Sequence, residues 1–383
     1  MMKKVLIFAL LCFIVCGVHA DDSTYARKIV DTLTSAAYWG RGYTKNGMSK
    51  AADFLQRQFK TIGLRPLNGE EYTQSFAFPV NTFPGKMKVK LNGKRLYAGK
   101  DFIVSPDSKG TKAKGRLTAT DSIHFFDTSK KIEVILANKL TWSVAHKESN
   151  QTTIIIDKNR VRRIPGKIKT DIQNELVSDF TAANVCGFVK GTEQPDSIIF
   201  ITAHYDHLGG MGNNVFFPGA NDNASGVSLL LTLANYYAAH PQKYSIGFIC
   251  FAAEEAGLIG SRYFVENPLV SLDKIRFVVN LDLLGTGEKG ITVVNATEYP
   301  EAFTALQNIN NSQKLVPEIK SRGKAANSDH YWFSEAGVPA FFMYTMGGPT
   351  AYHDVFDVSH ALPMNSINSM SELIKGFVGY LNK

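Results

Sequence analysis

Cysteine is scarce in this chain, which has only four among its 383 residues. Two of the four lie within the first twenty residues, so the rest of the chain contains only Cys186 and Cys250. This number excludes a fold held together by disulfides. Cys250 lies inside an apolar run, which favours a buried free thiol.

The sequence also lacks nucleic-acid-binding motifs, internal repeats and low-complexity segments, although its formal net charge is +8 at pH 7. Basic residues concentrate in the first half of the chain. There, Lys86, Lys88 and Lys90 alternate with apolar residues, as in a strand with one solvated face. We therefore interpret the positive charge as a solvated surface and expect no nucleic-acid partner.

Long apolar runs are missing except near the start, where Lys3 and Lys4 precede the run Val5–Val15. A small-residue cleavage site follows, so residues 1–20 have the pattern of a secretory signal peptide, and the run is too short to span a membrane. We expect a secreted or periplasmic protein with no stable membrane insertion after signal removal. Lipoprotein anchoring at Cys16 is the alternative, which we disfavour because no small residue directly precedes this cysteine.

Hydrophobic periodicity divides the rest of the chain into three parts. Residues 21–71 show helical spacing of apolar residues, as around Leu55. Residues 72–170 show short alternating strands separated by turn signals, which predicts a small β-rich inserted domain. Residues 171–383 alternate apolar strands with helical patterns. The expected fold class is α/β, with a mainly parallel central sheet flanked by helices and carrying that insert.

In the last part of the chain, the expected strands are the apolar runs 185–189, 198–203, 246–253, 275–284, 291–294 and 338–344. The expected helices are 225–240, 257–265, 298–309 and 364–381.

Metal-capable side chains follow several of these apolar runs. His204 follows one of them, and Glu254 and Glu255 follow another. Ligands in α/β folds gather at the carboxyl ends of the strands. Asp282 lies within a third run, where a buried carboxylate is costly unless it is paired or bound to a metal. This placement favours a metal site.

Five side chains offer the donor types that zinc takes in catalytic sites, namely His204, Asp222, Glu255, Asp282 and His353. Two Zn²⁺ ions sharing Asp222, together with three carboxylates and a bridging hydroxide, would form a neutral cluster that a partly buried cleft tolerates. Asp206 lies two residues after His204 and could accept the second imidazole N–H. Glu254 is not needed as a ligand, so it could accept a proton from the metal-bound water and pass it to a leaving amine.

Four motifs occur in order along this part of the chain: Ala203-His-Tyr-Asp-His207, Gly219-Ala-Asn-Asp-Asn-Ala-Ser-Gly226, Ala253-Glu-Glu-Ala-Gly-Leu-Ile-Gly-Ser261 and Asn280-Leu-Asp282. They resemble the motifs of the secreted co-catalytic dizinc aminopeptidases. Relatives of that family include bacterial leucyl aminopeptidase, glutamate carboxypeptidase and single-zinc glutaminyl cyclase. The resemblance extends from about Ala182 to the C-terminus and leaves the segment 72–170 unmatched. The loop after His353 departs from the Thr-Pro that many members have there, which puts the detail of the pocket in doubt.

The resemblance implies that His204 and Asp282 bind one zinc, that Glu255 and His353 bind the other, and that Asp222 bridges them. It also implies that Glu254 is the general base acting on a metal-bridging water, with Asp206 behind His204, and that a non-proline cis peptide follows Asp222.

Four further residues lie near these motifs. Asp329, in Ser328-Asp-His330, and Tyr352 are the candidates for substrate binding. His207 and His330 are interpreted as surface residues or as residues that support a ligand.

The resulting expectation is a secreted zinc-dependent aminopeptidase with peptide substrates. A glutaminyl cyclase-type acyltransferase and a dipeptide carboxypeptidase remain alternatives, as does a binding protein on a peptidase scaffold. The complete ligand set with Glu254 favours a two-metal hydrolase. The sequence carries no signal for a preferred N-terminal residue, for the role of the insert or for an oligomeric state.

Overall fold

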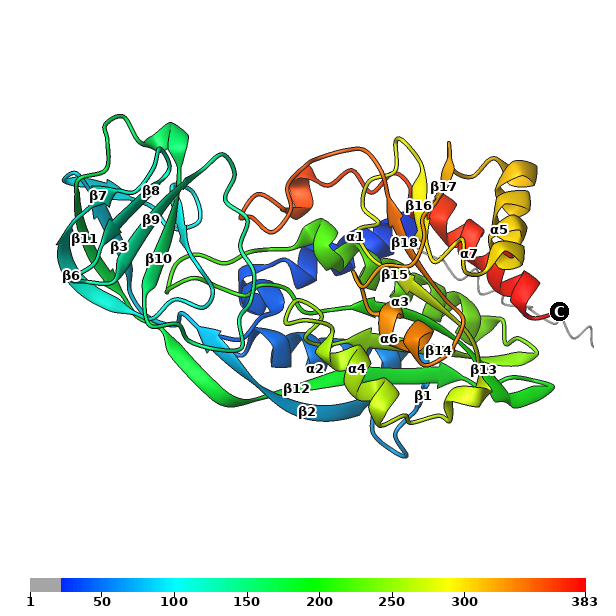
Figure 1. The fold of residues 1–383 in the computed structure, drawn as a ribbon. Coiled ribbons are helices and arrows are strands. Elements are labelled where there is room, and N and C mark those ends of the chain that lie inside the picture. Colours follow the sequence, from blue (N-terminus) through cyan, green and yellow to red (C-terminus); the bar gives the residue numbers. More distant parts are fainter. Residues whose placement is uncertain (1–21) are drawn as a thin grey trace, which may run out of the picture.

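The structure is a computed structural model that describes residues 22–383. The expected signal peptide, residues 1–20, and the alternative anchor at Cys16 lie outside the described residues. The chain forms a large α/β part and, at one end, a smaller part made of two β-sheets (Figure 1). Within the described residues, we find no helix whose length and apolar character would let it cross a bilayer.

The large part is built on a nine-stranded sheet. Its strands, in spatial order, are β1 (Arg65–Pro66), β12 (Glu175–Val189), β14 (Tyr244–Phe251), β13 (Gln194–His204), β15 (Ile275–Leu281), β18 (Ala340–Thr345), β16 (Ile291–Val294) and β17 (Ile319–Ser321), with β2 (Thr73–Thr82) paired to β12.

The predicted α/β class is confirmed, but the sheet is parallel mainly at its centre. Strands β14, β13, β15 and β18 are adjacent in this order and are parallel to one another. Antiparallel pairs lie on both sides of this centre, because β12 is antiparallel to β14 and β16 is antiparallel to β18. The central strands are covered on both faces and consist of near-continuous apolar residues, as expected for buried parallel strands.

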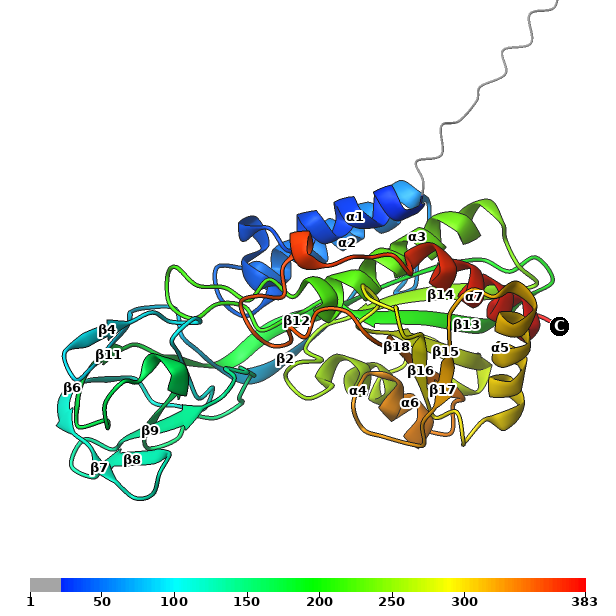
Figure 2. The same ribbon diagram turned by 90° about the horizontal axis from the view of Figure 1, so that it is seen from above.

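Helices cover both faces of the sheet (Figure 2). On one face lie α1 (Asp22–Leu33), α2 (Gly47–Ile62), α3 (Gly226–Ala239) and α7 (Ile367–Leu381), and α5 (Pro300–Gln313) packs against α7. On the other face lie α4 (Ile259–Glu266) and α6 (His330–Glu335). Successive side chains of β13 point to opposite faces of the sheet. Ile199 packs in the core under α3, and Phe200 packs with Phe264 of α4.

The smaller part consists of two sheets around a separate apolar core. One sheet contains β5 (Phe102–Val104), β10 (Thr152–Asp157), β9 (Ile132–Ala137), β8 (His124–Asp127) and β7 (Thr118–Ala119). The other contains β4 (Lys94–Leu96), β3 (Met87–Leu91), β11 (Lys167–Ile172) and β6 (Thr111–Arg116).

The boundaries of the predicted insert, residues 72–170, therefore differ at both ends from those of the two-sheet part. It includes β2, which lies in the nine-stranded sheet, and it stops within β11. The long strands β2 and β12 pair with each other over most of their length and connect the two parts. We call the region from β3 to β11 the insert.

Candidate metal centre

Neighbouring strands end at one edge of the nine-stranded sheet and present metal-capable side chains there. His204 is the last residue of β13 and lies opposite Phe251, the last residue of β14. Asp282 directly follows β15, which pairs with β13 in parallel. Because these strands are parallel and adjacent, their carboxyl ends bring together side chains that are far apart in the sequence.

The chain turns sharply after β14. Ala253 has a φ of 58°, which lies in the left-handed region. The carboxylate of Asp206 accepts hydrogen bonds from the backbone N–H groups of Glu254 (3.1 Å) and Glu255 (3.3 Å) and so holds the turn. Successive residues of a straight strand point to opposite sides, so this turn is what allows both glutamates to face the same site.

Asp222 lies in the irregular segment η3 (Ala220–Ser225), where its own backbone is not helical, and the peptide bond after it is cis, as the resemblance implies. The fully buried guanidinium of Arg41 donates to the carbonyl oxygens of Asp222 (3.1 Å) and Gly219 (2.8 Å). On the other side, the carboxylate of Asp357 accepts the N–H of Asp222 at 3.1 Å. The backbone around Asp222 is therefore held by residues from both ends of the chain.

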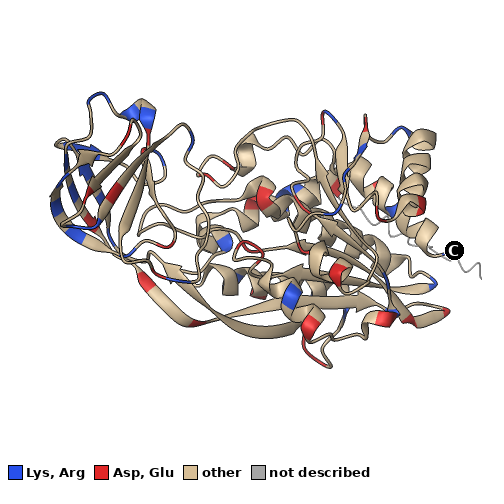
Figure 3. Cartoon of the chain, in the orientation of Figure 1, with Lys and Arg blue, Asp and Glu red and all other residues tan. Residues whose placement is uncertain are grey.

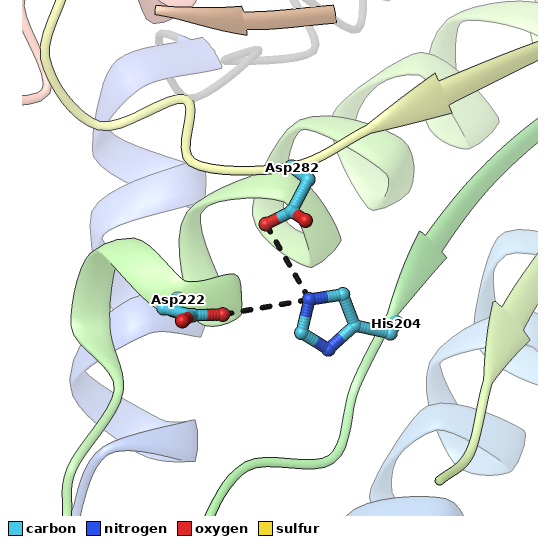
Figure 4. A group of neighbouring side chains, drawn as sticks. All are labelled: His204, Asp222 and Asp282. Atoms are coloured by element: carbon cyan, nitrogen blue, oxygen red, sulfur yellow. Dashed lines mark ion pairs between the residues drawn. The ribbon is translucent and has the colours of Figure 1, made fainter. Parts of the chain in front are cut away.

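The carboxylate of Asp222 lies between two groups of potential ligands. Its Oδ1 is 3.4 Å from Nε2 of His204, which is also 3.4 Å from Oδ1 of Asp282 (Figure 4). Its Oδ2 is 3.1 Å from Nε2 of His353, which is also 3.1 Å from Oε2 of Glu255. One carboxylate thus directs a different oxygen to each group, as a bridging ligand does.

These residues fit zinc by donor type and by charge. Imidazole nitrogens and carboxylate oxygens are the usual donors of catalytic zinc sites. One donor atom from each of His204, Asp222 and Asp282 lies within 4.8 Å of the others. The carboxylates of Glu254 and Glu255 are also largely buried in this site. So much buried negative charge is costly unless cations compensate for it.

The two adjacent glutamates have different electrostatic surroundings. Burial raises the pKa of Glu254 well above its usual range, although the nearby His204 opposes this shift. Burial acts on Glu255 too, but the imidazoles of His207 and His353 hold the pKa of this carboxyl well below its usual range. Of the two adjacent carboxyls, Glu254 is therefore the more basic and Glu255 the one that stays anionic.

Asp206 differs from the sequence-based expectation in its contacts. Nδ1 of His204 lies 3.3 Å from the backbone oxygen of Asp206 and 3.8 Å from its carboxylate Oδ1. The backbone carbonyl is therefore the nearer partner of the imidazole, while the carboxylate holds the N–H groups of the two glutamates. Burial raises the pKa of Asp206 to about 7, an effect that His204 opposes.

His207 has a larger role than its position in the sequence suggested. The side chain is fully buried, and its Nδ1 lies 2.6 Å from Oε1 of Glu255. One donor atom from each of His207, Asp222 and Glu255 lies within 4.8 Å of the others, and Nδ1 of His207 is 4.0 Å from Oδ1 of Asp222, so His207 lies beside the second group of potential ligands. A signal for it was available in the sequence, because it directly follows Asp206 at the carboxyl end of a buried strand.

A chain of buried polar groups supports Asp282. Ser328 donates through its Oγ to Oδ2 of Asp282 (3.2 Å) and accepts from the side-chain amide of Asn280 (2.8 Å). The hydroxyl of Thr202, on β13, donates to Oδ1 of Asn280 at 2.8 Å. Supports of this kind fix the orientation of a ligand, and sequence reasoning had not assigned any of these three residues.

The two candidates for substrate binding lie in different environments. Tyr352 is 43% exposed, and its ring stacks on that of His353 with centroids 4.0 Å apart. It is therefore a partly exposed side chain directly beside a predicted ligand. Asp329 is fully buried, and burial raises its pKa to about 7. Its assignment to substrate binding stays a prediction, to which this burial lends no support.

Comparison with known proteins gives matches over the same part of the chain. A sequence profile described as peptidase family M28 matches residues 184–378. "Aminopeptidase YwaD" of Bacillus subtilis is 28% identical over 256 residues, which cover 62% of this chain and 54% of that protein. The match therefore spans about half the length of this relative.

Solved structures match the fold over nearly the whole chain. BSAP, a zinc aminopeptidase from Bacillus subtilis, has a TM-score of 0.70 at 19% identity and covers 94% of both chains. An aminopeptidase from Aneurinibacillus sp. strain AM-1 has a TM-score of 0.65 at 19% identity and covers 93% of both chains. The family profile spans the strands and loops that build the site, from β12 to α7. The chain belongs to peptidase family M28.

Proposed function

We propose that this protein is a secreted zinc-dependent aminopeptidase that hydrolyses N-terminal residues from peptides. The observation that carries the proposal is the division of the Asp222 oxygens between two groups of nitrogen and oxygen donors. This arrangement suits two metal ions that share one carboxylate. The names of the relatives point the same way, since YwaD is called an aminopeptidase and BSAP a zinc aminopeptidase.

Two zinc ions are the metal content that we expect. His204 and Asp282 would hold one, Glu255 and His353 would hold the other, and Asp222 would be shared. Zinc held in this way polarises a peptide carbonyl and lowers the pKa of a water molecule. Elemental analysis is expected to find two zinc ions per chain, and a fully active protein with a single tightly bound metal would contradict this count.

Glu254 is the residue that moves the proton. Its carboxylate lies at the site, with Oε2 4.0 Å from Nε2 of His204, and its backbone is fixed by Asp206. As water oxygen bonds to the carbonyl carbon, Glu254 accepts a proton from that water. It then donates the proton to the amine nitrogen as the C–N bond breaks, which leaves the carboxylate unchanged after one turnover.

Secretion rests on the signal-peptide pattern of residues 1–20. It is tested by the N-terminus of the protein purified from its native compartment. A start close to residue 21 supports export with cleavage. Retention of residues 1–20 in a cytoplasmic protein contradicts it, and a lipid-modified Cys16 supports the anchored alternative.

The activity is tested by three substrate classes assayed side by side: aminoacyl anilides, unblocked peptides and peptides that begin with glutamine. We expect the release of free N-terminal amino acids. Pyroglutamate formation without hydrolysis would identify a glutaminyl cyclase-type acyltransferase. Cleavage confined to the C-terminal residue of acidic dipeptides would identify a carboxypeptidase. Zinc binding without turnover of any of these substrates would favour a binding protein.

A further inference from the structure

The insert carries a row of basic side chains across its four-stranded sheet. In the antiparallel register, Arg95 of β4 is opposite Lys90 of β3, Lys90 is opposite Lys169 of β11, and Lys169 is opposite Lys114 of β6. All four side chains are exposed. Like charges directly opposite each other destabilise a sheet, and here the repulsion extends over four strands. The row therefore differs from an ordinary solvated face, on which charges of both signs alternate.

The same face forms a hollow of about 550 Å³. The cations that line it are Lys90, Lys114, Arg116, Lys130, Lys167 and Lys169. Within residues 22–383, none of these six side chains forms an ion pair or a side-chain hydrogen bond. Figure 3 shows the concentration of Lys and Arg at this end of the molecule.

Asp127, the one acidic residue that lines the hollow, forms no ion pair with these cations within the described residues. Its carboxylate accepts hydrogen bonds from the backbone N–H groups of Arg116 (2.6 Å) and Lys130 (3.0 Å) and from the hydroxyl of Ser129 (2.9 Å). The acid thus joins β8 and its following turn to β6, and the charged ends of the surrounding side chains stay available. Gly93 and Gly115 lack side chains that would fill the hollow.

We propose that this hollow binds a linear acidic polysaccharide, whose sulfate or carboxylate groups pair with the basic row. The charges are complementary, and neighbouring strands are about 4.8 Å apart, so the row places cations at regular short intervals along a line. A concave site admits a polymer chain, whereas a flat bilayer surface cannot enter it. No aromatic side chain lines the hollow, so it lacks the stacking platform that single-stranded nucleic acids use.

The site is separate from the metal centre, so the proposal does not depend on the aminopeptidase activity. It revises the interpretation of Lys86, Lys88 and Lys90 as part of a merely solvated surface. Lys88 and Lys112 lie opposite Asp171, which also pairs with Lys86 at 3.7 Å, so this next row is partly neutralised. The ligand is therefore expected to follow the unneutralised row through Lys90 and Lys169.

The test measures binding of the purified full chain to heparin, polygalacturonate and neutral dextran at physiological salt. Wild type is expected to bind at least one of the two acidic polymers, but not dextran. The variant with Lys90→Gln, Lys114→Gln and Lys169→Gln is expected to bind about tenfold more weakly or worse, since three surface charge contacts are lost. Removing their mutual repulsion should leave its thermal unfolding midpoint unchanged or raised.

A matched control carries Lys28→Gln, Lys60→Gln and Lys314→Gln, three exposed lysines outside the insert. It changes net charge by the same amount and is expected to bind the acidic polymer as wild type does. Equal losses in the two variants, or no binding of either acidic polymer, would overturn the proposal. So would tighter binding to double-stranded DNA, single-stranded DNA or vesicles containing phosphatidylglycerol.

Discussion

Trp142 and His353 exchange two hydrogen bonds, although 211 residues separate them in the sequence. Nδ1–H of His353 donates to the carbonyl of Trp142 at 3.0 Å, and the N–H of Trp142 donates to the carbonyl of His353 at 2.9 Å. With Nδ1 protonated, Nε2 of His353 is left as the nitrogen that faces Asp222 and Glu255. The insert, which contains Trp142, thus orients a predicted zinc ligand.

Replacing Trp142 by alanine is expected to loosen His353. The indole is anchored by a hydrogen bond from Nε1 to the carbonyl of Val104 (2.8 Å) and by stacking on Phe217, so its loss frees the backbone that holds the imidazole. Zinc affinity should fall by about 10–100-fold, the usual effect of losing a group that orients a ligand. Competition with a chelator measures it. Trp332→Ala, which removes an indole outside this contact, should keep wild-type affinity.

Asp206→Asn is expected to weaken metal binding or activity by about 10–100-fold. The physical reason lies in the turn, because an amide nitrogen in place of one carboxylate oxygen cannot accept the N–H of Glu254 or Glu255. Zinc content and kcat should be measured together. Wild-type values for both would show that the turn after β14 holds without this carboxylate.

His207→Leu is expected to weaken zinc binding because Oε1 of Glu255 loses its partner at 2.6 Å. His207→Asn places an amide nitrogen near the position of Nδ1 and should restore part of the affinity. The measurement is the zinc dissociation constant of each variant. As a control, His240→Leu removes an exposed histidine at the C-terminal end of α3 and should leave the zinc dissociation constant unchanged. Equal behaviour of His207→Leu and wild type would leave His207 without a role at the metal centre.

The placement of His204, Glu255 and Asp282 could be predicted from local sequence, because each lies at the end of an apolar strand or shortly after it, and parallel strands end at one edge. The partners of Asp206, His207 and Trp142 could not be predicted in this way. They depend on a sharp turn after β14 and on contacts across the insert, and such long-range geometry leaves no periodic signal in the chain.

In the fold too, elements with a local sequence pattern could be predicted, whereas pairings between distant segments could not. The helix α2 was predictable because Ala51, Leu55 and Phe59 recur on one buried face and Gly63 ends it with a φ of 88°. The membership of β2 in the nine-stranded sheet was not, because alternation predicts a strand without naming its partner. That pairing moves the start of the insert beyond residue 72.

Burial of His330 is expected to make stability fall at mildly acidic pH. Burial lowers its pKa to about 4, although the backbone of Ser328 and Ala325 favours the protonated ring. Between pH 4 and the unfolded value of about 6.5, the unfolded state therefore binds more protons, so the free energy of unfolding decreases as the pH falls. From pH 7 to pH 5 this one group accounts for about 2 kcal/mol. In His330→Gln the decrease should be smaller by that amount, as measured by denaturant unfolding, and parallel curves would exclude the effect.

The last prediction separates Glu254 from Glu255, which are adjacent and of the same residue type. Glu255→Gln should lose zinc together with activity, because its carboxylate lies 3.1 Å from Nε2 of His353 and completes one group of ligands. Glu254→Gln should keep both metals and a near-normal KM, while kcat falls by about 10²–10⁴-fold, the contribution of general-base catalysis. The raised pKa of Glu254 and the lowered pKa of Glu255 point in this direction, since one group is suited to exchange a proton and the other is not. Zinc content, kcat and KM of both variants test the two assignments.

Zinc loss in Glu254→Gln with zinc retained in Glu255→Gln would reverse the two roles. Near-normal kcat in Glu254→Gln would show that Glu254 is not the general base.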